Sequence, residues 1–241
     1  EKYESLEGVE FHLNEWGMSS HFQKTVAEYP DLVFRNTEES PLFLVKLVDN
    51  LFAIEDNYNF PTDMLLYWGG AWETEKDEFF MGNRALLTAG NIPKPILTGY
   101  EMLAQLGTDR LEVEGPRVGR RISVLATKSS DKEIEMIVYN YNETDDDLSI
   151  SDQVSIQISG LQDGTYSIEE YSLDRENNNT YREWEKQGSP KSSKDADLKR
   201  LLKAGELSVT KSTSKQSVNG ILNMEFSLAR HSMILFKLRA Q

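Results

Sequence analysis

The 241-residue sequence contains no cysteine. This absence excludes a disulfide framework, a thiol nucleophile and any metal site built on thiolates. Histidine is also scarce, and the three present, His12, His21 and His231, are widely spaced along the chain. We therefore expect no zinc site and no histidine-based catalytic triad, and we predict no cofactor.

Basic residues and long apolar runs are also in short supply. The chain has 26 lysines and arginines against 40 acidic residues, which gives a formal net charge of −14. This charge repels phosphate backbones, so we expect no nucleic-acid partner. No apolar run is long enough to span a bilayer, so we expect no membrane partner. A soluble, disulfide-free chain suits the cytosol as well as the bacterial periplasm or secretion, and the compartment stays open.

The chain nevertheless has an ordinary hydrophobic content of 39%, and residues 1–108 read as two successive β/α units. A first strand is expected over residues 9–15, followed by a helix that begins with Ser40 as N-cap and Pro41 in its first turn. The second unit has a strand over residues 63–72 and a helix over residues 95–106, which Gly107 ends.

The second strand contains a short continuous apolar run, residues 64–68, which predicts a parallel strand buried on both faces. Two β/α units cannot close a sheet or cover both of its faces. We therefore expect these units to be the end of a larger α/β domain whose N-terminal part lies upstream of Glu1. If that domain is a (β/α)8 barrel, the missing part is a partner that this chain needs.

From residue 109 to residue 241 the pattern changes to short alternating runs separated by turn signals, which predicts an antiparallel β-sandwich. A short polar helix is expected around residues 195–204, and residues 175–181 are expected to form an exposed polar loop. The expected strands cover residues 122–126, 134–141, 154–158, 166–173, 207–209, 221–226 and 231–238.

The first strand ends in Asn14-Glu15-Trp16-Gly17. A carboxylate at the carboxyl end of a strand, flanked by an amide and an indole, suits a sugar-cleaving nucleophile, because it can attack an anomeric carbon or stabilise the charge that develops there. The alternative is an ordinary surface glutamate.

Other residues near the two strand ends are candidate substrate contacts. Trp16, Trp68 and Trp72 could stack on sugar faces or simply fill the core. Asn14 could orient a sugar hydroxyl or only shape a turn. Arg84 could pair with a substrate carboxylate or form a structural salt bridge.

Three collinear stretches resemble glycoside hydrolase family 39, which contains β-xylosidases and α-L-iduronidases. They are residues 11–20, the segment Phe79 to Pro95 with its Ile92-Pro93-Lys94-Pro95 block, and residues 171–207. The resemblance implies a (β/α)8 barrel followed by a β-sandwich and a substrate that is an oligosaccharide or other glycoside. It does not separate xylosidase-like from iduronidase-like chemistry.

Family 39 enzymes retain anomeric configuration, with a nucleophilic glutamate after the seventh barrel strand and an acid/base glutamate, in an Asn-Glu-Pro motif, after the fourth. Only one further β/α unit separates Glu15 from the sandwich, so the resemblance maps Glu15 to the nucleophile. The other Asn-Glu pair, Asn142-Glu143, falls in the sandwich and cannot be the acid/base. We therefore expect the acid/base to be absent and the isolated chain to be inactive. The alternative is a non-catalytic carbohydrate-binding or structural module derived from such an enzyme.

Overall fold

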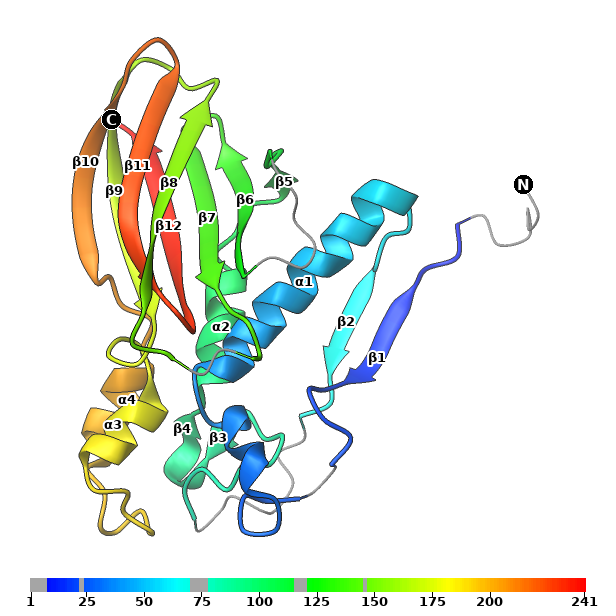
Figure 1. Ribbon diagram of the computed structural model, residues 1–241, viewed down its shortest axis with the longest axis vertical. Coiled ribbons are helices and arrows are strands. Elements are labelled where there is room, and N and C mark those ends of the chain that lie inside the picture. The colour runs from blue at the N-terminus through cyan, green and yellow to red at the C-terminus, as the bar shows by residue number, and fades with distance from the viewer. Residues whose placement is uncertain (1–7, 22–23, 70–77, 115–120, 145–146) are drawn as a thin grey trace.

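The computed structural model describes residues 8–21, 24–69, 78–114, 121–144 and 147–241. A pair of parallel strands, two helices and an antiparallel sandwich follow one another in layers (Figure 1). Within the described ranges, no helix combines the length and apolarity needed to cross a bilayer.

The N-terminal layers contain the two β/α units. Strand β1 (His12–Trp16) leads through the short 3-10 helix η2 (Pro30–Arg35) to helix α1 (Glu39–Tyr58), and β2 (Met64–Tyr67) then pairs with β1 in parallel. The connection to the second helix includes β3 (Leu87–Thr88), η3 (Ala89–Asn91) and β4 (Ile92–Pro93), which form a small hairpin. Helix α2 (Pro95–Leu103) follows directly.

The ends of the two helices differ from the sequence prediction. Helix α1 begins at Glu39 with Glu38 as N-cap, and Ser40 does not cap it, because its hydroxyl donates to the carbonyl of Thr37 instead. Helix α2 ends at Leu103, before Gly107. A Cβ at Gly107 would lie 2.3 Å from the carbonyl carbon and oxygen of Lys128, so close packing against the sandwich requires this glycine.

The apolar run of β2 is buried on one face only. Leu65 and Tyr67 pack with Trp16 beneath the helices, whereas Met64 and Leu66 are 40% and 48% exposed. The expectation that both faces are buried is therefore wrong for this chain, because α1 and α2 cover the same side of the strand pair. The opposite side presents apolar residues to solvent.

The sandwich consists of a six-stranded sheet and a two-stranded sheet. The larger sheet has the order β10-β9-β12-β7-β6-β5, and the smaller one pairs β11 with β8; every pairing is antiparallel. Two short helices, α3 (Thr180–Lys186) and α4 (Leu198–Gly205), lie between β9 and β10 in the chain. The strands are β5 (Asp109–Arg110), β6 (Ile122–Ser130), β7 (Glu133–Asn140), β8 (Ser151–Ser159), β9 (Gly164–Leu173), β10 (Lys211–Ser217), β11 (Ile221–Ala229) and β12 (Ser232–Ala240).

The six-stranded sheet buries both of its faces. One face packs on β8 and β11 through residues such as Val138, Phe236 and Leu222. The other face packs on α1 and α2, where Leu42 and Met102 contact a second cluster of sheet residues: Leu125, Ile137, Tyr139, Leu173, Met233 and Leu235. Both helices are therefore packed between the parallel strands and the six-stranded sheet of the sandwich.

Two sandwich predictions are wrong. Residues 207–209 form no strand, and the strand in this part of the chain is β10, whose sequence KSTSKQS is polar because it lies at the sheet edge. The supposed exposed loop at residues 175–181 contains buried Asn178, Asn179 and Thr180. Asn179 caps α3, since its side-chain oxygen accepts a hydrogen bond from the backbone N–H of Arg182.

Candidate active site

The candidate residues meet where β1 and β2 end. The strands run in the same direction, so both carboxyl ends lie at one end of the molecule, toward the bottom of Figure 1. The pairing continues past β2, because the backbone N–H of Trp68 donates to the carbonyl of Trp16 over 2.9 Å. The adjacent carboxyl ends of the two strands therefore carry Asn14 and Glu15, from β1, and Trp68, which follows β2. Barrel enzymes build their active sites at such strand ends.

A β-bulge sets the position of Glu15. Leu13 pairs with Leu65 and Trp16 pairs with Tyr67, so two residues of β1 face a single residue of β2. Glu15 has a φ of 58°, a left-handed conformation that is uncommon outside glycine. Backbone strain of this kind is often found at functional sites, so it supports a functional reading of Glu15.

The bulge sends Trp16 into the core and leaves Glu15 exposed. The Trp16 ring is 7% exposed, lies 5.1 Å from the ring of Tyr67 and packs between the strands and the helices. This burial favours the core alternative for Trp16 over the sugar-stacking one. Among the described residues, the Glu15 carboxylate has no hydrogen-bond or ion-pair partner, so it is available to a ligand.

Trp68 and Arg84 form a second pair at the strand ends. Trp68 is 36% exposed, and the guanidinium carbon of Arg84 lies 5.8 Å from the centre of its ring. Arg84 also donates to the carbonyl of Ser19 in the loop after β1. Its guanidinium packs on Gly17, where a Cβ would lie 3.3 Å from the guanidinium carbon. Arg84 therefore connects the loops that follow the two strands.

A buried lysine holds the turn that carries Arg84. Lys94 is fully buried, and its ammonium group donates to the backbone carbonyl of Asn83 over 3.1 Å and to its side-chain oxygen over 3.3 Å. The same Asn83 oxygen accepts the backbone N–H of Ala85 over 2.9 Å. The Ile92-Pro93-Lys94-Pro95 block thus serves the site indirectly, by fixing this turn.

Arg35 is a site residue that the sequence does not reveal. It is 2% exposed and donates to the carbonyl of Gly82 over 3.1 Å and to that of His21 over 3.0 Å, so it bridges the same two loops. Burial, together with the nearby charge of Arg84, lowers the pKa of Arg35. A lone arginine beside a short 3-10 helix carries no motif, so only the folded arrangement identifies it.

Trp72, a predicted sugar contact, lies outside the described residues. Glu143 follows the sandwich strand β7 and forms an ion pair of 3.2 Å with Lys46 of α1. The described site therefore offers Glu15 as its candidate nucleophile, with Asn14, Trp68 and Arg84 around it.

Comparisons with known proteins find relatives among the glycoside hydrolases. A β-xylosidase from Caldicellulosiruptor saccharolyticus is 25% identical over 155 residues, which cover 64% of this chain and 31% of that protein. A monomeric β-xylosidase from Caulobacter crescentus CB15 shares the fold with a TM-score of 0.73 and 15% identity, over 97% of this chain and 46% of the other. A bacterial orthologue of human α-L-iduronidase gives a TM-score of 0.72 and 15% identity, over 98% and 43%.

The chain spans less than half the length of these relatives. At such low identity the structural matches establish the fold alone. The sequence profile of glycosyl hydrolases family 39 matches residues 42–223, a range that begins after β1 and so does not include Glu15. Because the profile matches well over half of the sequence, the chain belongs to glycosyl hydrolases family 39.

Proposed function

We propose that this chain is the C-terminal part of a retaining glycoside hydrolase and that Glu15 is its nucleophile. In this proposal β1 and β2 are the seventh and eighth strands of a (β/α)8 barrel, residues 1–108 end that barrel, and residues 109–241 form the accessory sandwich. The observation that carries the proposal is the exposed Glu15 at a strained bulge, at the carboxyl end of a strand whose parallel neighbour ends in Trp68.

In the reaction, a carboxylate oxygen of Glu15 attacks the anomeric carbon while the bond to the leaving oxygen breaks. The leaving oxygen takes a proton from a second carboxyl group, and a glycosyl ester forms on Glu15. Water, deprotonated by the same second group, then hydrolyses the ester with retention of configuration. Trp68 presents a flat apolar face to the sugar, and Asn14 orients a hydroxyl.

Arg84 fits this arrangement best as a support for Trp68 and for the loop after β1, since its guanidinium contacts both. Its alternative role as a partner for a substrate carboxylate would need the same guanidinium to turn toward the ligand. Trp16 is buried and packs β1 against the helices, so in this proposal it is a core residue. Trp72 stays a predicted sugar contact.

The acid/base glutamate, in this proposal, comes from an upstream part of the barrel. The open side of the strand pair supports such a partner, because Met64 and Leu66 present apolar surface there. Parallel strands are normally covered on both faces, so packing of further barrel strands would bury this surface. A retaining enzyme needs its two carboxyl groups roughly 5 Å apart, and proton donation typically contributes on the order of a hundredfold or more.

Two assays test this proposal. The isolated 241-residue chain should show no measurable hydrolysis of aryl xylosides or aryl iduronides. In the longer protein that includes the upstream barrel, Glu15→Gln should lower kcat by about a thousandfold or more. The matched control is Glu10→Gln, which removes an exposed carboxylate paired with His12 near the other end of β1 and should leave kcat unchanged. Normal turnover by Glu15→Gln would refute the nucleophile assignment.

A further inference from the structure

Positive charge is concentrated in one stretch of this acidic chain. Residues 186–215 contain eight lysines and arginines against three acidic residues, whereas the whole chain has a net charge of −14. The rest of the chain is therefore even more acidic than the total suggests. This uneven distribution creates a local positive field on an otherwise negative surface.

Part of this charge lies on the helices α3 and α4 and on the connection between them, which packing and hydrogen bonds hold in place. Leu201 of α4 is fully buried and packs with Phe79, Phe80 and Ile92 from the segment after β2. The connection between the helices is held at both ends. At one end the indole N–H of Trp184 donates to the carbonyl of Pro190 over 2.9 Å, and at the other the backbone N–H of Asp197 donates to the side chain of Gln187 over 2.9 Å.

Three lysines, on α4 and on the connection between α3 and α4, are not neutralised by the protein. Arg200 pairs with Glu183 at 2.7 Å, and Lys203 pairs with Glu206 at 2.8 Å. Among the described residues, Lys191, Lys194 and Lys199 are exposed and have no carboxylate partner. We call these three residues the lysine surface.

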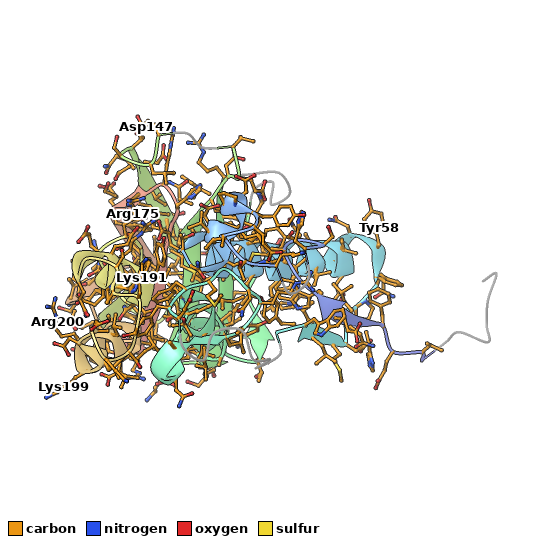
Figure 2. The ribbon with its side chains drawn as sticks, turned by 90° about the horizontal axis from the view of Figure 1, so that it is seen from below. Tyr58, Asp147, Arg175, Lys191, Lys199 and Arg200 are labelled. Atoms are coloured by element: carbon orange, nitrogen blue, oxygen red, sulfur yellow. The ribbon has the colours of Figure 1, made fainter. Side chains whose placement is uncertain are left out.

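The lysine surface lies at the same end of the molecule as the carboxyl ends of β1 and β2. Figure 1 shows α3 and α4 at the end toward which β1 and β2 run, and Figure 2, seen from that end, places Lys191, Lys199 and Arg200 together over α3 and α4. Tyr58, at the C-terminal end of α1, lies far across the same view. The carboxyl ends of β1 and β2 and the helices α3 and α4 therefore lie at one end of the molecule, across which a long glycan chain can extend.

We propose that the lysine surface binds an acidic polysaccharide, one whose carboxylate groups are separated by neutral sugars. The choice of a glycan rests on the proposed function, and the choice of an acidic one rests on the unpaired lysines. A polysaccharide with widely spaced carboxylates can place a few of them on the three lysines while its neutral sugars lie against the acidic surface around them. A polymer with a phosphate on every unit would extend beyond the patch and be repelled by the surrounding carboxylates.

The test compares binding of two xylans by the whole 241-residue chain. The probes are glucuronoxylan and the same polymer after chemical reduction of its carboxyl groups. The chain should bind glucuronoxylan about tenfold more tightly than the reduced polymer, and the difference should fall as NaCl rises from about 20 to 300 mM, because salt screens exposed charges.

Variants locate the binding surface. The triple variant Lys191→Gln, Lys194→Gln, Lys199→Gln should lose most of the preference for glucuronoxylan. The matched control neutralises three lysines that lie away from α3 and α4, Lys128→Gln, Lys132→Gln and Lys215→Gln, of which Lys128 is paired with Asp131 over 3.4 Å, and it should keep the preference within about twofold.

Three results would overturn the proposal. They are equal binding of the two xylans, an equal loss of binding in both triple variants, and tighter binding of RNA or of anionic vesicles than of glucuronoxylan. Glu15→Gln should leave this binding intact. A failure of the nucleophile assignment is thereby distinguished from a failure of the lysine surface, because binding is measured without turnover.

Discussion

At the scale of single residues, two adjacent glutamates at the start of α1 meet opposite environments. Glu38 is 1% exposed, and its two oxygens accept hydrogen bonds of 2.6 and 3.0 Å from the guanidinium of Arg182 in α3. Burial alone would lower the pKa of Arg182, but the hydrogen bonds and charge of Glu38 raise it. Glu39 is half-buried, and burial raises its pKa.

We expect Glu38→Gln to lower the free energy of unfolding by about 3–5 kcal/mol, because it leaves Arg182, whose side chain is only 12% exposed, without its main counter-charge. Glu185→Gln is the matched control, since Glu185 binds the same arginine over 2.7 Å but is 40% exposed. The control should cost at most about 1 kcal/mol. Urea unfolding measures both variants, and equal costs would contradict this account of Glu38.

Ionisation of Glu39 makes folding less favourable as the pH rises. Burial, aided by the charge of Glu38 and opposed by His231 and Arg182, places its folded-state pKa above the unfolded value. Such a carboxyl group favours folding while protonated and loses this contribution as the pH rises through the folded-state pKa. Glu39→Gln should therefore be more stable than the parent chain at pH 7.

This advantage of Glu39→Gln should disappear as the pH falls below about 4, where the parent carboxyl group is protonated in both states. Thermal unfolding of both proteins between about pH 3 and 8 measures the difference. A gap that does not change with pH would show that ionisation of Glu39 is not its cause.

At the scale of elements, the bulge in β1 decides which side chains reach the site. Leu13 and Trp16 lie three residues apart and yet pack in the same cluster, which a regular strand with its period of two does not allow. The left-handed Glu15 takes up the extra residue. The backbone strain of the bulge and the exposure of the carboxylate therefore have one cause.

This account predicts an inverted order of stability at residue 15. In a regular strand, glycine is less stable than alanine by about 0.5–1 kcal/mol. At a φ of 58°, glycine relieves strain, so Glu15→Gly should be more stable than Glu15→Ala by about 1 kcal/mol. Equilibrium urea unfolding of the two variants gives the difference directly. A more stable alanine variant would mean that residue 15 is not left-handed.

Most elements that the sequence predicts are those with an apolar pattern, and the polar helix α4 is the exception. The β7 and β12 strands and the two helices α1 and α2 carry apolar residues at the required spacing, and all are found close to their expected places. Strand β10 has no such pattern, because pairing with β9 at a sheet edge needs backbone groups and few apolar side chains. The sequence does not predict helix α3, because its polar cap, Asn179, is buried through a long-range contact with Glu38 and a local one with the carbonyl of Asp174.

The candidate site likewise contains residues that the sequence predicts and residues that only the folded chain reveals. Asn14, Glu15 and Trp68 are local to strand ends, so strand prediction places them. The bulge depends on pairing between distant segments, and therefore the burial of Trp16 could not be foreseen. Arg35 acts through carbonyl groups of two loops that meet only in the folded chain.

At the scale of the whole molecule, the strand pair and the sandwich share the helices between them. Besides the apolar contacts of α1 and α2, the buried Asp49 of α1 accepts hydrogen bonds of 2.7 Å from Ser123 and 2.9 Å from Tyr139 of the sandwich. The hydroxyl of Thr180 donates over 2.6 Å to the carbonyl of Pro93. We therefore infer that the described parts unfold together.

Leu42→Ala tests this inference. Leu42 is fully buried between α1 and the sandwich, so its truncation should lower the free energy of unfolding by about 2–5 kcal/mol. Tryptophan fluorescence and far-ultraviolet circular dichroism should report the same urea midpoint in the parent chain and the same downward shift in the variant. Separate midpoints would show that the sandwich unfolds independently of the β/α units.

The central claim is that Glu15 forms the covalent bond to the sugar. The most direct measurement labels the longer protein, including the upstream barrel, with a 2-fluoro glycoside and locates the adduct by peptide mass spectrometry. A retaining mechanism traps the glycosyl ester on the nucleophile. The account predicts the adduct on Glu15 and no labelling of Glu15→Gln. An adduct on any other residue would contradict it.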